Sequence, residues 1–318
     1  MDAVANDEDI NMQVISNGGG QNLQFSYMIE KYAFRQIAGV PLPTIGFKVN
    51  DTSGEIFKFV DMDEYREYAY KMKEFSDKGY WSKESILGKV SRDEDFVNGD
   101  AAMMSWNIGS VVERVERINK DNPKWKAEVV DATNGINRLV NAYTNNGMAI
   151  NAKSKNPERA LMALNILRYD KDVYELTWYG IENLHWQPKD DDLYIKLGES
   201  PKFPADNVCP WGWYSKKLDK TSIAENNVYE KIVNNWVENY TVDNPLLDFC
   251  FNDKNVKKEM DNVGKVIKKY GVPIDVGMCE DVDAAISEYR SKLNEAGLDK
   301  IYNECKKQIQ EYLKNNKQ

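Results

Sequence analysis

The sequence predicts a mixed fold of helices and strands, either α/β or α+β. In the first half, short apolar runs of strand length alternate with segments whose apolar residues recur every three or four positions, as on one face of a helix. From Val228 onward only the helical spacing recurs. The chain has 318 residues, of which 42% are hydrophobic and 29% charged. It is therefore long enough to bury a sizeable core, in one large domain or in two lobes.

The first elements are a helix, a hairpin and a second helix. Residues 23–37 carry aromatic residues at helical spacing. Residues 45–60 contain two apolar runs separated by a polar turn with a glycine, which predicts a β-hairpin. Asp61 or Asp63 then caps an amphipathic helix that ends before Gly79.

The middle of the chain predicts short strands around one helix. Residues 101–105 form a small apolar strand that leads into Trp106, and the following helix is broken at Asn122-Pro123. Further strands are expected over 127–130 and 147–151.

A strong helix start follows at Asn156-Pro157-Glu158, which combines a capping residue, a first-turn proline and a first-turn acid. We expect that helix to bury Leu161, Leu164 and Leu167. Residues 178–213 then form a long stretch rich in Asp, Pro and Trp, and such irregular stretches are more often functional than random.

The last third predicts helices with four apolar faces. These faces are Val228, Ile232, Trp236, Tyr240; Val256, Met260, Val263, Ile267, Tyr270; Val282, Ile286, Tyr289, Leu293; and Ile301, Cys305, Ile309, Tyr312.

Composition excludes several classes of function. The net charge of −9, with no basic stripe to offset it, argues against a nucleic-acid partner. No apolar run reaches the ~18 residues of a membrane span. The acidic, polar start of the sequence is unlike a signal peptide or a lipoprotein leader.

The sequence carries no catalytic or metal-binding signature. The four cysteines lie far apart and His185 is the only histidine, so we expect no metal site, no serine triad and no cysteine dyad. Spacing favours free thiols but leaves disulfides open. No cofactor motif is present, since Gly18-Gly19-Gly20 lacks the Lys-Ser/Thr of a phosphate-binding loop. Paired carboxylates like those of a glycosidase stay possible in a chain with 51 acids.

The aromatic residues are the unusual feature. Trp106 follows a strand and precedes Asn-Ile-Gly, where open α/β sheets gather ligands, but the residue can equally pack beneath the next helix. Trp211 and Trp213 flank Gly212 on a turn, with the same two interpretations. Exposed tryptophans are what a carbohydrate site needs, because the C–H face of a pyranose packs on an aromatic plane.

The order of several segments resembles one family. Residues 96–106 (FVNGDAAMMSW) resemble the "F-x-x-G-x-A-A-M … W" segment of family 1 extracellular solute-binding proteins, which include the maltose-binding type. Residues 146–160 (NGMAINAKSKNPERA) are similar to that family's hinge strand and helix start. Residues 178–186 (WYGIENLHW), 244–249 (NPLLDF) and 289–308 resemble the LipO-like lipoprotein branch, which carries a C-terminal domain of unknown function. Together the matches cover nearly all of the chain.

The resemblance implies an α/β, periplasmic-binding-protein-like fold of type II, with two lobes joined by a hinge and much of the N-lobe lacking. On this basis residues 1–142 are the first part of the C-lobe, 143–205 are the hinge strand and the remaining N-lobe segment, and 206–318 return to the C-lobe and add the C-terminal helices. The family's leader and lipidated cysteine have no counterpart in the sequence, which as given would not be exported.

The same resemblance implies a non-enzymatic, extracytoplasmic lipoprotein that captures a solute for the permease subunits of an ABC importer, and an oligosaccharide is the expected solute. Carried over to this sequence, Tyr27, Trp106, Trp211 and Trp213 become candidate stacking platforms and Asn107 a candidate hydroxyl partner. Two alternatives stay open, a glycoside-active enzyme with an aromatic-lined cleft and a peptide-binding protein of the same fold.

Overall fold

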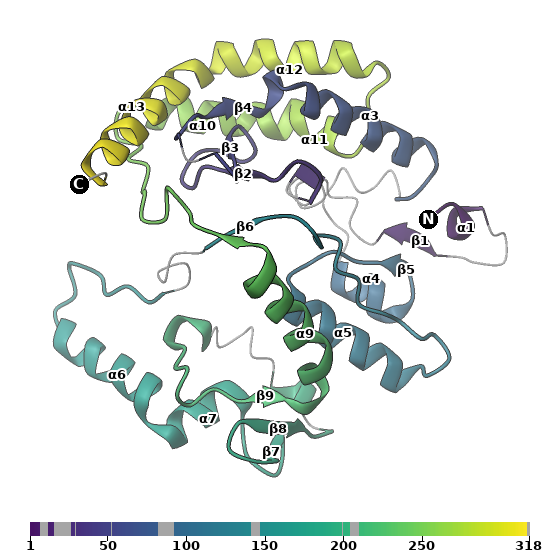
Figure 1. Cartoon of the computed structure of the whole chain (residues 1–318), viewed down its shortest axis with the longest axis vertical. Coiled ribbons are helices and arrows are strands. Elements are labelled where there is room, and N and C mark those ends of the chain that lie inside the picture. Colours follow the sequence, from purple (N-terminus) through teal and green to yellow (C-terminus); the bar gives the residue numbers. More distant parts are fainter. Residues whose placement is uncertain are drawn as a thin grey trace. The chain divides into compact units, whose positions relative to one another are not determined.

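A computed structural model describes residues 1–6, 12–15, 27–28, 30–51, 53–81, 92–140, 147–198, 200–203 and 210–316 (Figure 1). The chain divides into two compact units. Unit 1 comprises residues 1–140 and 235–318, and unit 2 comprises residues 141–234. Unit 1 is thus built from both ends of the chain. These boundaries lie close to the predicted division at 142 but 29 residues beyond the one at 205, and the assignment of units to lobes stays a prediction.

Unit 1 contains three small sheets and most of the helices. Its strands are β1 (Gln13–Ile15), β2 (Phe34–Gln36), β3 (Ile45–Lys48), β4 (Phe57–Lys58), β5 (Ala101–Met103), β6 (Arg138–Leu139) and β10 (Thr241–Val242). Its helices are α1 (Asp2–Ala5), η1 (Phe59–Asp61), α3 (Asp63–Asp77), α4 (Arg92–Asn98), α5 (Ile108–Asp121), α10 (Lys257–Val266), the π-helical turn η5 (Ile267–Gly271), α11 (Val272–Asp275), α12 (Val282–Ala296) and α13 (Leu298–Asn316). Strands β2, β3 and β4 are antiparallel, whereas β1 pairs with β5 and β6 with β10 in parallel.

Unit 2 is smaller. It contains α6 (Pro157–Tyr169), α7 (Lys171–Tyr179), β7 (Trp186–Pro188), β8 (Leu193–Lys196), η3 (Ser200–Lys202), η4 (Pro210–Trp213) and β9 (Thr221–Ser222). Helix α9 (Ile223–Asn239) begins in unit 2 and ends in unit 1. The described buried hydrophobic side chains of unit 2 form one aromatic cluster, Tyr174, Tyr179, Trp186, Tyr194 and Trp213.

Most of the predicted elements are present. The hairpin over 45–60 is confirmed by β3 and β4, with Gly46 opposite Phe57. The helix ending before Gly79, the break after α5 and the helical last third are also confirmed.

Other predictions are wrong. The helix predicted over 23–37 is helical at the described residues 27–28 and 30–32 but then becomes strand β2, because Ala33 adopts φ 53° and ends the helix. Residues 127–130 and 147–151 form no strand, and the pairing in this region falls at β6 instead. Within the stretch taken as irregular, β7 and β8 pair as a hairpin. Leu161, which the sequence predicted to be buried, is exposed on α6. Residues 23–26 of the predicted helix, Asn146 of the segment that resembles the family's hinge strand, Gly18-Gly19-Gly20 and Cys209 lie outside the described residues.

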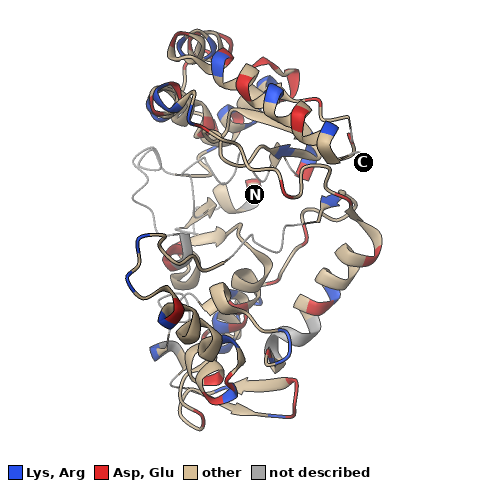
Figure 2. Ribbon diagram, turned by 90° about the vertical axis from the view of Figure 1, so that its left-hand side faces the viewer, with Lys and Arg blue, Asp and Glu red and all other residues tan. Residues whose placement is uncertain are grey.

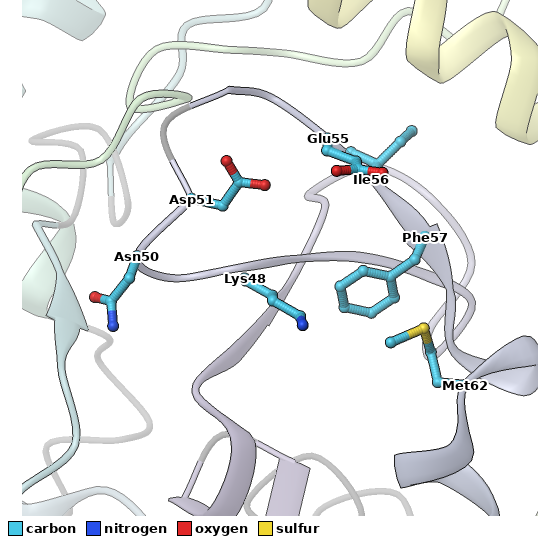
Figure 3. A pocket seen from close by; sticks show the side chains of 7 residues that line it. All are labelled: Lys48, Asn50, Asp51, Glu55, Ile56, Phe57 and Met62. Carbon is cyan, nitrogen blue, oxygen red and sulfur yellow. The ribbon is translucent and has the colours of Figure 1, made fainter.

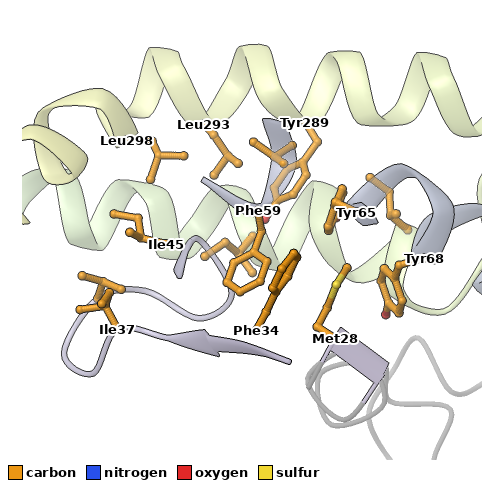
Figure 4. Packing of buried hydrophobic residues seen from close by; sticks show 14 of the residues in the cluster. Met28, Phe34, Ile37, Ile45, Phe59, Tyr65, Tyr68, Tyr289, Leu293 and Leu298 are labelled. Atoms are coloured by element: carbon orange, nitrogen blue, oxygen red, sulfur yellow. The ribbon is translucent and has the colours of Figure 1, made fainter. Parts of the chain in front are cut away.

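The core of unit 1 joins the two ends of the chain. Side chains from the β2–β4 sheet and α3 interdigitate with side chains from α12 and α13 (Figure 4). Tyr65 of α3 and Tyr289 of α12 meet with ring centroids 6.4 Å apart. Helices α12 and α13 therefore bury one face each, and Lys, Arg, Asp and Glu occupy the outside of the helices at the top of Figure 2.

One acid lies inside this core. Asp275, at the end of α11, is almost completely buried, and the Tyr68 hydroxyl donates to its Oδ1 at 3.3 Å. Burial raises the pKa of Asp275 to about 8, although the Tyr68 hydrogen bond opposes the shift. Close by, the Trp81 indole donates to the carbonyl of Val276 at 2.9 Å.

The buried acid predicts a pH dependence of stability. An unfolded aspartate ionises near pH ~3.9, so between about pH 4 and pH 8 the folded state keeps a proton that the unfolded state has lost. Stability contributed at this position therefore falls as the pH rises through that window. We expect Asp275→Asn, which keeps an acceptor for Tyr68, to unfold at a higher temperature than the wild type at pH 8 and to show a flatter dependence of melting temperature on pH. The exposed Asp248→Asn is the control. Parallel pH profiles for Asp275→Asn and wild type would contradict this interpretation.

Gly277 supplies a second test of the same region. Its φ is +66°, and a Cβ built on it would lie 2.1 Å from the backbone oxygen of Met72 on α3. Gly79 also has positive φ (+70°) but nothing lies within 4 Å of its Cβ position. We expect Gly79→Ala to cost about 1 kcal/mol from backbone strain alone, and Gly277→Ala about 3 kcal/mol beyond that. Urea unfolding of both variants measures the difference, and equal losses would show that α3 moves aside freely.

Candidate functional site

The loop between β5 and α5 presents an exposed tryptophan. Trp106 follows the carboxyl end of β5, the strand that pairs in parallel with β1, and its side chain is 46% exposed. Met103, the last residue of β5, is also exposed. The structure therefore places an indole at the strand end where ligands collect in open α/β sheets.

Asn107, the next residue, caps the N-terminus of α5. Its side-chain oxygen accepts a hydrogen bond from the backbone N–H of Ser110 at 3.0 Å, so it is the N-cap of α5. The cap uses the amide oxygen but leaves the NH₂ group for other partners. As a candidate hydroxyl partner, Asn107 can thus act as a donor.

Tyr27 lies at the edge of the unit 1 core. Its ring is partly buried, with centroid distances of 5.6 Å to Tyr68 and 6.2 Å to Tyr32. The Lys31 ammonium donates to its hydroxyl at 3.2 Å. Tyr27 therefore packs against α3, whereas Trp106 and Asn107 share the loop before α5. Its role as a stacking platform stays a prediction.

The Trp211 and Trp213 pair is divided between surface and core. Both lie on η4 in unit 2, but Trp211 is exposed while Trp213 is only 7% exposed and belongs to the aromatic cluster. The side chain of Met148 covers Gly212 between them, so closely that a Cβ would lie 2.9 Å from its sulfur. Trp213 was predicted to be a ligand platform, but it is a core residue, because its ring is covered within unit 2.

A polar cluster in unit 1 was not predicted. The Arg138 guanidinium lies over the Trp236 ring, 3.6 Å from its centroid, and its Nη2 donates to the Thr133 hydroxyl. The Trp236 indole donates to Asp131 Oδ2 at 2.7 Å, and the Thr133 hydroxyl donates to Asp131 Oδ1 at 2.7 Å. These four side chains form a closed ring of contacts. Trp236 and Asp131 are 105 residues apart, so no local spacing announces the cluster.

Two further charged groups act on this cluster. Burial raises the pKa of Glu30, an effect that the Arg138 guanidinium opposes. Burial lowers the pKa of Arg35, and the positive charge of Arg138 lowers it further. Burial also lowers the pKa of Arg138, while the charges of Asp131 and Glu30 oppose that shift. Arg138 Nε is buried without a hydrogen-bond partner among the described residues. Planar polar groups beside an indole are the combination that recognises sugar hydroxyls and pyranose faces.

A surface hollow of about 590 Å³ lies at the β3–β4 hairpin (Figure 3). It is lined by Lys48, Asn50, Asp51, Glu55, Ile56, Phe57 and Met62, none of which was a predicted site residue. Figure 3 shows Lys48 between the Asn50–Asp51 turn and the Phe57–Met62 side. Asn50 accepts a hydrogen bond from Asn137 at 2.7 Å, which ties the rim to the residue before Arg138.

Within the described ranges, no three or more His, Cys, Asp or Glu side chains gather as metal ligands do. Cys250, Cys279 and Cys305 are free thiols. No helix among the described residues is long and apolar enough to cross a membrane.

Comparison with known proteins finds a matching domain and a similar transport protein. Residues 245–314 match the domain of unknown function DUF3502. Over 279 residues the chain is 27% identical to a carbohydrate ABC transporter substrate-binding protein of Streptococcus pneumoniae serotype 4, a match that covers 85% of this chain and 54% of the relative. The chain thus spans about half the length of this curated relative.

Solved structures agree on the fold. An N-glycan transport solute-binding protein (NgtS) of Streptococcus pneumoniae, crystallised with Man1GlcNAc, is similar with a TM-score of 0.66 and 19% identity, over 94% of this chain and 69% of the other. The alginate-binding protein AlgQ2 without calcium is similar with a TM-score of 0.60 and 14% identity, over 97% of this chain and 66% of the other. The fold is α/β and periplasmic-binding-protein-like of type II. In sequence the chain is similar to a carbohydrate ABC transporter substrate-binding protein, and the DUF3502 match lies near its C-terminal end.

The cap at α5 gives a test of how the Trp106 loop is held. We expect Asn107→Ala to lower the free energy of unfolding by about 1 kcal/mol, because the Ser110 N–H loses its acceptor. Asn107→Asp keeps the acceptor and adds a negative charge at the helix N-terminus, so it should match or exceed the wild type. Urea unfolding compares the three proteins, and a stability of Asn107→Ala equal to that of Asn107→Asp would rule out the cap as the support of this loop.

Proposed function

We propose that the chain is the carbohydrate-binding component of an ABC importer and captures an oligosaccharide for the membrane permease. The observation that carries the proposal is the exposed Trp106 indole at the carboxyl end of β5, in a fold of the solute-binding type. The name of the Streptococcus pneumoniae relative and the NgtS complexes with Man1GlcNAc and Man5GlcNAc support a sugar as the solute.

The proposed contacts follow from sugar chemistry. Trp106 and Trp211 each offer an exposed aromatic plane for the C–H face of a pyranose ring. Tyr27 is a further candidate platform, through the part of its ring that the core leaves open. The Asn107 amide and the Arg138–Trp236 cluster offer donors and acceptors for hydroxyl groups.

In this proposal the chain performs no chemistry on the solute. Its relatives are substrate-binding transport proteins, and the proposed role is to close on the ligand and to present it to the permease on the extracytoplasmic side. Energy for transport then comes from a different subunit. A glycoside-active enzyme would differ by releasing sugar from a chromogenic glycoside.

A thermal-shift screen against oligosaccharides tests the proposal. A sugar at a concentration of 100 times its Kd should stabilise the chain by about 2.7 kcal/mol, which raises its melting temperature measurably. Trp106→Ala should weaken the binding by about fivefold or more, because one aromatic–sugar contact contributes on the order of 1 kcal/mol. Isothermal titration measures the affinity of both proteins for the same sugar.

Trp125→Ala is the matched control, since Trp125 is a loop tryptophan of unit 1 that is 48% exposed. An equal loss of affinity in both variants would remove Trp106 from the site. No stabilisation by any oligosaccharide, or turnover of a chromogenic glycoside, would contradict the proposed function of this chain.

A further inference from the structure

Two strands of unit 1 bring two arginine side chains near each other. Arg35 lies on β2, in register with Phe47 of β3, and Arg138 lies on β6 (Figure 1). The Asn137 side chain donates to Asn50 at 2.7 Å, which ties β6 to the turn that follows β3. The two guanidinium groups are close enough for the charge of Arg138 to lower the pKa of Arg35. Their positive charges therefore repel each other.

The Arg35 guanidinium has no partner of its own. It is half-buried, and it makes no hydrogen bond or ion pair with a described residue. Burial lowers its pKa, and no described acid opposes that shift. Taking a charge out of water is costly unless a counter-charge takes the place of the water. Without a ligand, Arg35 therefore weakens the folded chain.

Arg138 is held in place but is only partly satisfied. It lies over the Trp236 ring, 3.6 Å from the centroid, and its Nη2 donates to the Thr133 hydroxyl. Its Nε is buried and finds no acceptor in the part of the chain that the structure describes. A buried N–H group without an acceptor costs free energy, so this guanidinium can gain from a further hydrogen bond.

The two acids near this pair do not neutralise it. Both carboxylate oxygens of Asp131 already accept hydrogen bonds, one from Thr133 and the other from Trp236. Asp131 and Glu30 raise the pKa of Arg138, but neither acts on the arginine of β2. Burial also raises the pKa of Glu30, which makes its carboxyl group less acidic. One positive charge of the pair is thus left without a counter-charge.

We propose that Arg35 and Arg138 bind a carboxylate, and that the oligosaccharide captured by this chain therefore contains an acidic sugar. The inference rests on the proposed function and adds the charge of the solute to it. A carboxylate is planar, and its two oxygens accept the paired N–H groups of a guanidinium in good geometry. The chain as a whole has a net charge of −9, so the pair is a local feature and no part of a general basic surface.

A neutral sugar fits the pair less well. Its hydroxyl groups can accept hydrogen bonds from arginine, but they leave two neighbouring positive charges uncompensated. An inorganic anion such as sulfate carries the charge but makes none of the contacts of a sugar ring. The experiment therefore has to separate acidic sugars from neutral sugars and from free anions.

The probes are uronic acid trimers of the gluco, galacto and manno series, each with its carboxyl-reduced neutral counterpart, and sodium sulfate. Isothermal titration measures their affinity for the 318-residue chain as the wild type, Arg35→Gln, Arg35→Lys and Arg117→Gln. Arg117 is the control, because it is an exposed arginine of unit 1 and its replacement changes the net charge by the same amount.

We expect at least one acidic trimer to bind the wild type tenfold or more tightly than its neutral counterpart, and sulfate to bind weakly. Arg35→Gln should abolish this preference, whereas Arg117→Gln should keep it. Arg35→Lys should keep part of it, because lysine retains the charge but not the planar fork. In the absence of ligand, Arg35→Gln should melt at the same temperature as the wild type or higher, since it removes an uncompensated charge.

Several outcomes would overturn the inference. Equal affinity for acidic and neutral trimers, or binding of neutral trimers alone, would contradict the acidic solute and leave the sugar-binding function standing. Sulfate that binds as tightly as the acidic trimers would indicate a site for inorganic anions. A lower melting temperature of free Arg35→Gln would assign Arg35 a structural role. If no trimer of either kind binds, the inference and the proposed function both fail.

Discussion

The packing of the C-terminal helices on the β2–β4 sheet and α3 is the contact on which the rest of the structure depends. It joins residues from the first quarter of the chain to residues after 256, so unit 1 exists only when both ends of the chain have met. Closing so long a loop costs entropy that only a large apolar contact offsets. Unit 2 is consequently an insertion, reached and left at 140/141 and 234/235. Residues 245–314, which match DUF3502, supply 14 of the 33 buried side chains described in the main core cluster of unit 1.

A few polar and steric details fix the geometry of that contact. The α11 turn is held by the Tyr68–Asp275 and Trp81–Val276 hydrogen bonds and by the close approach of Gly277 to Met72. A buried acid costs stability at neutral pH, while apolar packing alone would tolerate several arrangements. The directional hydrogen bonds and the glycine therefore select one position of α11 against α3.

Strand pairing and a helix cap hold the candidate site residues of unit 1. Parallel pairing of β6 with β10 brings Arg138 and Trp236 together in unit 1, near the points where the chain passes into and out of unit 2. The Trp106 loop is positioned separately, by β5 and by the Asn107 cap on α5. In the proposed function these rigid supports matter because an aromatic platform contributes affinity only if its ring is already oriented before the sugar arrives.

By itself the sequence determined the features that depend on neighbours in the chain. Helical spacing and the hairpin over 45–60 follow from local sterics and hydrogen bonding, and the ordered motifs of residues 96–106 and 146–160 resemble the solute-binding family. The predicted helix caps are wrong in part, because α3 begins after Met62 without a side-chain cap and Asn156 makes no capping hydrogen bond. Tertiary structure alone decided which aromatic residues are buried. Trp211 and Trp213 have the same local surroundings, but only Trp213 meets the aromatic cluster of unit 2. It also decided that Trp236 stacks with Arg138 and that Leu161 is exposed on α6. Such outcomes depend on contacts between residues far apart in the sequence, which no local pattern encodes.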